Sequence, residues 1–221
     1  MAKTIIHKNN QALLGDKNHL EIAEQKPFSD LIFEVLSEKE PNPLESRIFN
    51  MILNLSIDHG EDAPSAVATI KHAKKKTSTI SEAISEGVLQ INNTHGGAIE
   101  PCMELLYKIK QEGLKVEDVV AEALEKKQYI GGFGHRLYKD IDPRAELIFR
   151  SLVEANIGAE YIGLARHIRE EFQKHGKNLV INIDGAIAVA LCGFGWDSKV
   201  SKAVFISARV PGLAAHFLNN H

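Results

Sequence analysis

The feature that most constrains this chain is the helical spacing of its apolar residues, which recurs from residue 30 to the C-terminus. Ile48, Ile52 and Leu55, for example, are four and three residues apart, so they share one face of a helix. No strands alternate with these helices in the way that a parallel sheet requires. The sequence therefore predicts a mainly α-helical protein.

Helices are expected where apolar periodicity is bounded by capping or breaking residues. The expected segments are residues 30–40, 44–57, 65–76, 77–93, 101–113, 116–128, 142–157, 161–176 and 203–221. Ser29–Asp30 should cap the first of them, and Gly113 should end the fifth. Residues 1–28 are polar and weakly patterned, which favours an N-terminal arm or extended lead-in.

Residues 178–195 are ambiguous. Their β-branched start is compatible with a strand, whereas Gly185–Leu191 suits a helix begun by Asp184.

Composition excludes several classes of protein. A net charge of -3 provides no basic face for nucleic acid. No apolar run approaches the roughly 20 residues of a membrane span, and the N-terminus lacks a signal-peptide core. Cys102 and Cys192 lie in apolar surroundings, so a reducing compartment is expected and the cytoplasm is the default location.

Four short segments combine titratable side chains with glycine, and a bland alternative exists for each. His59 in SIDHGEDAPSA lies at a helix junction, where a capping or loop histidine is common. His95 in NNTHGGAIEP precedes two glycines that allow close backbone approach to a ligand, although glycine pairs often form simple turns.

The other two segments are IGGFGHRLYKDIDPRAE and NLVINIDGAIAVAL. In the first, three glycines precede His135, and Arg136, Lys139 and Arg144 add fixed positive charge; the alternative is a solvated surface loop. In the second, Asp184 stands among apolar residues, where a buried carboxylate must be paired or have a chemical function. The alternative interpretation is that Asp184 is the N-cap of the helix that follows.

A carboxylate and neutral histidines are the functional groups needed to enolise a thioester. The carboxylate removes an α-proton, and a histidine N–H stabilises the enolate oxygen. A second histidine can polarise the carbonyl of the other substrate, while arginines bind its carboxylates. The histidines lack HxxxH or Cys/His spacing, so no metal is expected in this chemistry.

At these segments the chain resembles the citrate synthase superfamily, especially its cleaving branch of citryl-CoA lyases and the C-terminal module of ATP-citrate lyase. GGFGHRLYKDIDPRAE is similar to GFGHRVYKxxDPRA, NTHGGAIEP to LHGGANE, and NIDGAIAVAL to NVDGLIGVAF. DHGEDAPSA and SARVPGLAAHFLNNH also match family segments, so the resemblance covers about residue 44 to the end. The family has a long N-terminal helical region in full synthases, and its absence here favours the short lyase form.

The resemblance implies an all-α citrate synthase-like fold, with residues 1–221 as one domain and about 96–195 as an inserted small CoA-binding subdomain. It implies that His95 stabilises the thioester enolate, Asp184 is the α-carbon base and His135 polarises the carbonyl. Substrate carboxylates are assigned to His59, Arg144 and Arg209. Coenzyme A contacts are assigned to Ile130, Gly131, Gly132, Phe133, Gly134, Lys139, Lys177 and Asn182.

The activity that this resemblance implies is cleavage of citryl-CoA to acetyl-CoA and oxaloacetate. The alternatives are a citrate synthase that condenses these products and hydrolyses the thioester, and a non-catalytic CoA-binding subunit of a citrate-activating complex. Acyl-CoA and di- or tricarboxylates are then the small-molecule partners, with coenzyme A entering as substrate and no permanently bound cofactor. A homodimer is implied, as is possible association with a citryl-CoA synthetase.

Overall fold

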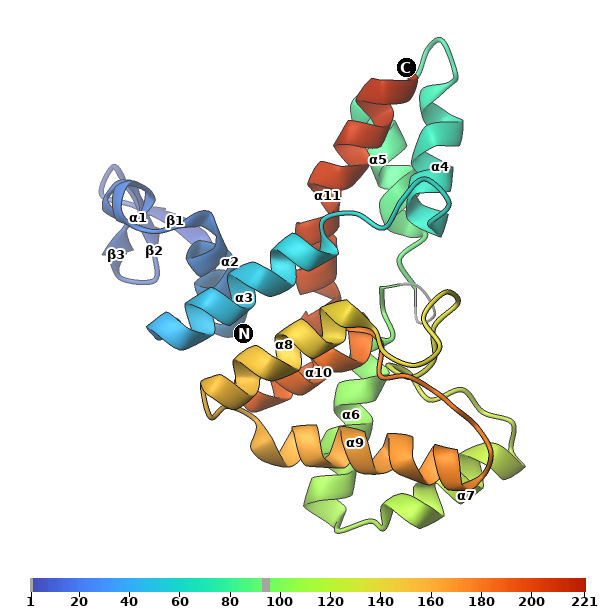
Figure 1. Cartoon of the computed structure of the whole chain (residues 1–221). Coiled ribbons are helices and arrows are strands. Elements are labelled where there is room, and N and C mark those ends of the chain that lie inside the picture. The colour runs from blue at the N-terminus through green and yellow to red at the C-terminus, as the bar shows by residue number, and fades with distance from the viewer. Residues whose placement is uncertain (1, 93–95) are drawn as a thin grey trace.

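The computed structural model describes residues 2–92 and 96–221 and confirms the mainly helical fold (Figure 1). Three short strands come first: β1 (Ile5–Lys8), β2 (Gln11–Leu14) and β3 (Lys17–Asn18). The helices that follow are α1 (His19–Gln25), α2 (Phe28–Ser37), α3 (Pro43–Ser56), α4 (Pro64–Ala73), α5 (Ile80–Leu89), α6 (Ile99–Glu112), α7 (Val116–Glu125), α8 (Pro143–Glu154), α9 (Ala159–Lys174), α10 (Ile183–Gly193) and α11 (Ser201–Asn220).

Local sequence explains where several helices begin and end. The Asn42 side chain accepts the backbone N–H groups of Leu44 and Glu45, and the Glu45 side chain accepts the N–H of Asn42, so α3 has a complete capping box. Pro43 occupies its first turn, where no N–H is needed. Helix α6 ends at Gly113, as expected, because glycine takes the left-handed conformation there (φ 66°) without strain.

The start of the first long helix differs from the expected Ser29–Asp30 cap. Helix α2 begins at Phe28, and Pro27 occupies the cap position. Ser29 is buried within the first turn, and Asp30 instead accepts a hydrogen bond of 2.6 Å from Ser46 Oγ on α3. The Ser29–Asp30 cap is therefore wrong, because a tertiary contact uses the carboxylate that local sequence offers as a cap.

The ambiguous segment resolves as a helix without a full strand. Ile181 makes only an isolated antiparallel bridge to Phe133, and α10 begins at Ile183. The cap is Asn182, whose side chain accepts the N–H of Gly185 at 3.1 Å. The N-cap alternative for Asp184 is therefore wrong, and its side chain lies in the first turn of the helix.

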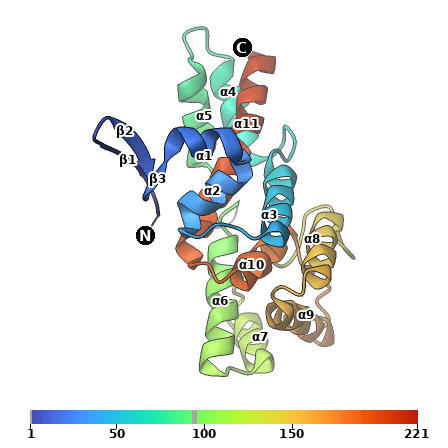
Figure 2. The same ribbon diagram turned by 90° about the vertical axis from the view of Figure 1, so that its left-hand side faces the viewer.

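Residues 2–28 contain regular secondary structure, whereas the sequence predicts an arm or extended lead-in over residues 1–28. The strands β1, β2 and β3 form an antiparallel sheet in that order, and α1 follows directly. Asn9 and Asn10 both have positive φ, which suits the two-residue turn between β1 and β2. The sheet projects from the body (Figures 1 and 2), and Lys3 and Lys26 pair with the buried Glu34 of α2.

The main hydrophobic core joins α2 and α3 to α6, α8, α9 and α10. Helix α10 is central, since its residues from Gly185 to Cys192 are all buried. Helices α4 and α5 pack with the C-terminal part of α11 as a second group, seen at the top of Figure 2. Helix α11 passes from the second group to the first, so segments distant in sequence meet at the junction of the two groups. Among the described residues, no helix combines the length and apolarity needed to cross a bilayer.

Candidate active site

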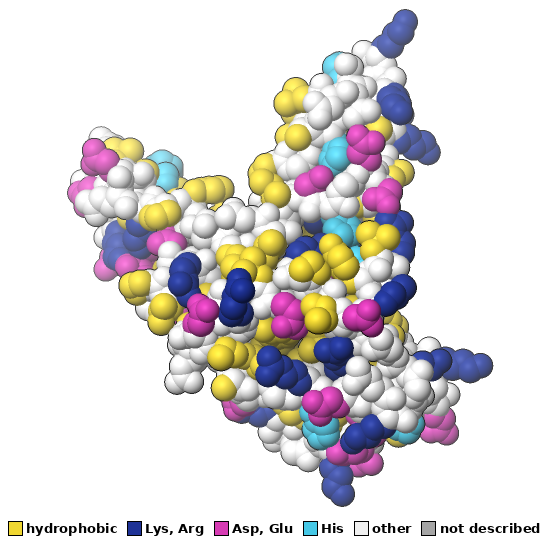
Figure 3. All heavy atoms as spheres, in the orientation of Figure 1, with side chains coloured by type: hydrophobic (Ala, Val, Ile, Leu, Met, Phe, Trp, Pro, Cys, Tyr) yellow, Lys and Arg dark blue, Asp and Glu magenta, His cyan; other side chains and the backbone are white. Residues whose placement is uncertain are grey.

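A cavity of about 190 Å³ is lined by residues of all four predicted segments. Helix N-termini contribute Arg144 of α8 and Asp184 of α10, and loops contribute His59 and His135. Figure 3 shows histidine side chains close to Lys and Arg side chains at the junction between the two helical groups. The remaining lining residues are Gly96, Tyr129, Gly134, Arg136, Asn182, Ile183 and Phe205.

Asp184 is the carboxylate of this cavity. Asn182 places it by capping α10 and by donating a hydrogen bond of 2.8 Å from its amide nitrogen to the Gly134 carbonyl. Burial raises the pKa of Asp184 to about 6, against the opposing effect of Arg144 and Arg209. A carboxyl group with this pKa exchanges protons readily near neutral pH, as a general acid or base must.

Arg144 is held in place by the buried carboxylate of Asp142. Asp142 is 1% exposed, and its oxygens accept from the backbone N–H, Nε and Nη2 of Arg144 at 2.8–3.0 Å. The same carboxylate accepts the N–H of Ile183 at 3.1 Å. Hydrogen bonding and charge from Arg144 keep the pKa of Asp142 below its ordinary value, although burial opposes this. Asp142 therefore fixes the guanidinium before any substrate binds.

The outer edge of this guanidinium faces two imidazole rings. Arg144 Nη1 lies 3.0 Å from His59 Nδ1, and Nη2 lies 3.2 Å from His135 Nε2. Burial, reinforced by the charge of Arg144, lowers the pKa of both histidines, so both rings are neutral near pH 7.

The hydrogen bonds of His135 determine its tautomer and therefore the kind of substrate atom that can bind beside it. The backbone N–H groups of Leu137 and Tyr138 lie 3.0 Å from its Nδ1, so Nδ1 is the acceptor and Nε2 carries the hydrogen. Since Arg144 can only donate, two donors meet at Nε2 and Nη2. A substrate oxygen with negative charge would satisfy both donors.

Arg209 lies beside the cavity and does not line it. It is buried, donates from Nε to the Ser56 carbonyl at 2.9 Å, and stacks over the Phe205 ring at 4.6 Å. Its charge contributes to the lowered pKa of His59 and partly opposes the burial that raises the pKa of Asp184. The structure thus gives Arg209 a positioning role, and its predicted contact with substrate stays a prediction.

His95 lies outside the described residues. The next residue, Gly96, lines the cavity with φ of 70°. A Cβ at Gly96 would lie 2.2 Å from the Phe205 ring, so only glycine fits there.

The family model described as "Citrate synthase, C-terminal domain" matches residues 1–221, which is the whole sequence. The chain belongs to the citrate synthase family. Citrate synthase 2 of Bacillus subtilis is 32% identical over 91% of this chain and 54% of its own length. The chain spans about half the length of such curated citrate synthases.

Two solved structures bear on this membership. A citryl-CoA lyase from Hydrogenobacter thermophilus superposes with a TM-score of 0.91 at 34% identity, covering 98% of this chain and 84% of that one. An ATP citrate lyase from Methanothrix soehngenii, solved in complex with citrate and coenzyme A, gives 0.86 at 22% identity, over 99% of this chain and 38% of the other. The second likeness shows the shared fold of the family.

The predicted coenzyme A residues fall in four places. Gly134 and Asn182 line the central cavity, whereas Ile130 and Gly131 line a second pocket of about 350 Å³ between α6 and α7. Phe133 is in the core, and Gly132 packs against Gly185 and Cys102. Lys139 donates to the His135 carbonyl, and the Lys177 side chain is exposed. Binding of coenzyme A by these residues stays a prediction.

Sequence reasoning missed several residues of the citrate synthase-like site. Tyr129 lines both pockets, and Asp142 positions Arg144. Asp58 anchors the turn before His59 by accepting from His216 Nε2 of α11 at 2.9 Å. Asp142 carries a usable signal, because an Asp–Pro pair before apolar periodicity marks a helix start. The partners Asp58 and His216 are too far apart in sequence to be paired by any local pattern.

Proposed function

We propose that this member of the citrate synthase family cleaves citryl-CoA to acetyl-CoA and oxaloacetate. One observation supports it above all: a carboxylate with a pKa near 6, Asp184, shares a cavity with the convergent donors of His135 and Arg144. That pairing suits a reaction that makes and breaks a carbon–carbon bond between a thioester α-carbon and a ketone.

The two halves of the cavity have separate tasks in this proposal. The His135 N–H and the Arg144 guanidinium stabilise the negative charge on the oxygen that is a hydroxyl in citryl-CoA and a carbonyl in oxaloacetate. The hydroxyl gives up its proton to solvent as this charge develops. As the carbon–carbon bond breaks, its electron pair passes to the acetyl α-carbon, which receives a proton from the carboxylic acid form of Asp184, and solvent then reprotonates Asp184. Stabilisation of the enolate by His95 is proposed from the family resemblance.

The two portions of the substrate occupy different pockets in this proposal. His59 and Arg144 would bind carboxylates of the oxaloacetate half, since the fixed guanidinium has N–H groups on the cavity side. Coenzyme A would extend through the pocket between α6 and α7, past Tyr129 and along Ile130–Gly131. Coenzyme A is thus substrate in this proposal, and no permanently bound cofactor is required.

The cleavage direction is supported by the likeness to the Hydrogenobacter citryl-CoA lyase over 84% of its length. Condensation to citrate is the second candidate, favoured by the 32% identity to Citrate synthase 2 of Bacillus subtilis. Both reactions use the same carbon–carbon chemistry, and only the synthase hydrolyses the thioester.

Thiol release separates the two candidates. Purified protein supplied with citryl-CoA should form oxaloacetate, followed with malate dehydrogenase and NADH, and should release no free thiol. Supplied with acetyl-CoA and oxaloacetate, a synthase releases free CoA continuously, and that result would overturn cleavage as the main activity. A CoA-binding subunit without catalytic function would bind CoA and turn over neither substrate.

We also propose that the chain acts in the cytoplasm and that it forms a homodimer, as the family resemblance implies. An enzyme that uses citryl-CoA requires a ligase that activates citrate with coenzyme A, so a citryl-CoA synthetase is the expected partner. Pull-down with such a synthetase, with and without citrate and CoA, tests that association.

A further inference from the structure

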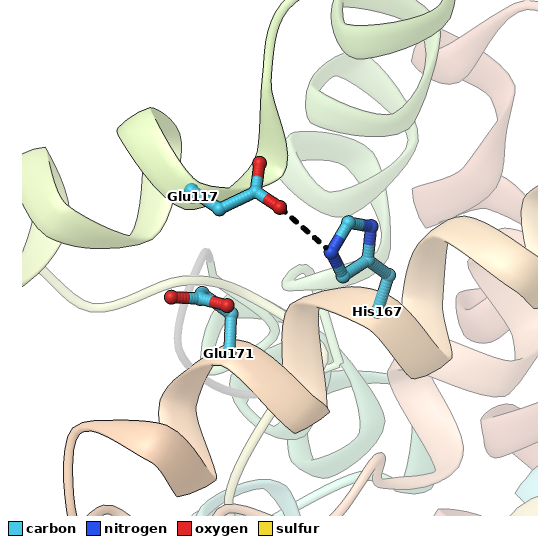
Figure 4. Close-up of side chains that lie close together, drawn as sticks. All are labelled: Glu117, His167 and Glu171. Atoms are coloured by element: carbon cyan, nitrogen blue, oxygen red, sulfur yellow. Dashed lines mark hydrogen bonds and ion pairs between the residues drawn. The ribbon is translucent and has the colours of Figure 1, made fainter.

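A second group of ionisable side chains lies away from the active-site cavity, where α7 packs against α9. Glu117 comes from the first turn of α7, and His167 and Glu171 lie one turn apart on α9. Figure 4 shows the three side chains directed into the space between the two helices. None of them lines the cavity that holds Asp184.

The distances in this group suit a single metal ion. His167 Nε2 lies 3.1 Å from Glu117 Oε1, and one ligand atom from each of the three residues lies within 4.8 Å of the others. Two ligand atoms about 2.1 Å from one Zn²⁺ ion are about 3.4 Å apart in a tetrahedral site.

The burial of Glu171 argues for a cation at this place. Glu171 is only 6% exposed, and a carboxylate so placed needs compensation. Its Oε2 contacts Lys174 Nζ at 2.7 Å, and its Oε1 lies 3.5 Å from His175 Nε2. Both partners are solvent-exposed side chains at the end of α9, so a divalent ion would compensate the charge more completely.

We propose that Glu117, His167 and Glu171 bind a divalent transition-metal ion, with Zn²⁺ as the ion of choice. The imidazole favours such an ion over Mg²⁺ or Ca²⁺, which prefer oxygen ligands alone. The ion would cross-link α7 to α9. Helix α9 in turn holds the loop after His135, because Arg169 donates to the Asp140 carbonyl at 3.1 Å.

The test is zinc binding by the full chain after treatment with a chelator. Isothermal titration should show one Zn²⁺ bound per chain and no comparable binding of Mg²⁺. His167→Ala and Glu117→Gln should each weaken Zn²⁺ binding at least about 10-fold, the loss that even hydrogen-bonded partners of metal ligands cause. Cobalt should give a visible absorption spectrum with the native chain and lose it in His167→Ala.

Two variants provide matched controls. Glu122→Gln makes the same change on an exposed residue of α7 and should leave zinc affinity unchanged. Lys174→Gln removes the competing ammonium group and should preserve or strengthen binding. Zinc should also raise the melting temperature of the native chain and of both controls, but not of His167→Ala. Equal zinc affinity in the native chain and His167→Ala, or no binding at micromolar zinc, would overturn the proposal.

Discussion

At the scale of single residues, two aspartates at the N-termini of neighbouring helices have pKa values that are shifted in opposite directions. Asp184 faces a cavity with little to replace its hydration, so its pKa rises to about 6. Asp142 receives hydrogen bonds from Arg144 and Ile183, and its pKa falls below the ordinary value. Two carboxyl groups with different pKa values can have different roles. The raised pKa of Asp184 suits the proposed proton transfer, and the ionised Asp142 suits the positioning of Arg144.

The first prediction concerns the proton taken up and released by Asp184. Exchange of the α-protons of acetyl-CoA with deuterated solvent needs the carboxylate form, so its rate should rise as pH passes through about 6 and then level off. NMR of acetyl-CoA measures this rate. Asp184→Asn should lower it by about 10²–10⁴-fold, whereas Asp118→Asn on α7 should leave it unchanged. Exchange independent of both pH and Asp184 would refute the assigned base.

The second prediction concerns Asp142→Asn. Loss of charged hydrogen bonds to Arg144 should lower the free energy of unfolding by about 2–3 kcal/mol and raise KM for citryl-CoA. Because the folded-state pKa of Asp142 is lowered, its contribution is present above the ordinary value of 3.8 and is lost as pH falls through the folded value. Urea unfolding from pH 3 to 7 should therefore show a flatter acid limb in Asp142→Asn. An unchanged acid limb contradicts the assigned role.

The sequence predicted Asp184, His135, His59 and Arg144 at the site because each belongs to a distinctive segment with glycine or proline nearby. It could not predict that Arg209 would donate to a backbone carbonyl. An arginine side chain has several possible partners within reach, and only the packing of α11 selects among them.

At the scale of elements, one stripe of α11 holds the turn that carries His59. Arg209, Gly212 and His216 are three and four residues apart and lie on one helix face. Arg209 and His216 hydrogen-bond to Ser56 and Asp58, and Gly212 packs directly on the Ile57 backbone. Helix α11 thus supports the turn that carries His59.

The third prediction compares two helical glycines. A Cβ at Gly212 would lie 2.2 Å from the Ile57 carbonyl, so Gly212→Ala should displace the turn, destabilise the fold by about 1–3 kcal/mol and reduce activity. Gly163 in α9 has nothing within 4 Å, so Gly163→Ala should stabilise by about 0.5–1 kcal/mol with normal activity. Thermal unfolding and the lyase assay measure both. Similar behaviour of the two variants would exclude this role of α11.

Helix positions followed from apolar periodicity, but the small elements did not. The turn at Asn9–Asn10 is a hairpin signal, yet the flanking strands are short and mostly exposed, so they lack a strong alternating pattern. Asn182 and Asp184 are both acceptable caps by sequence, and the hydrogen bond from Asn182 to Gly134 decides between them. In this second case a contact distant in sequence made the choice.

At the scale of the whole molecule, the projecting N-terminal sheet and α11 are separated by a notch (Figure 3). A pocket of about 250 Å³ lies at its base, lined by α2, α3 and α11. Phe28, at its rim, is 76% exposed, and Ile57 is 47% exposed. Apolar side chains gathered in a concave surface are typical of a subunit interface.

The fourth prediction follows from this notch. The native chain should have the mass of a dimer by light scattering, and Phe28→Asp should shift it towards the monomer. An aspartate in the first turn of α2 is compatible with the helix dipole, so the monomer should stay folded. Val153→Lys changes a comparably exposed apolar residue on α8 and should leave the mass unchanged. A native monomer would contradict the proposed homodimer.

The carboxylate of Asp142 should couple the local unfolding of two helix N-termini. It accepts the amide hydrogens of Arg144 and Ile183, so it joins the beginnings of α8 and α10 although 39 residues separate them in the chain. Native-state hydrogen exchange should detect these two amides as one cooperative unit, with equal opening free energies. In Asp142→Asn the two values should diverge, and the base and the guanidinium would then fluctuate independently of each other.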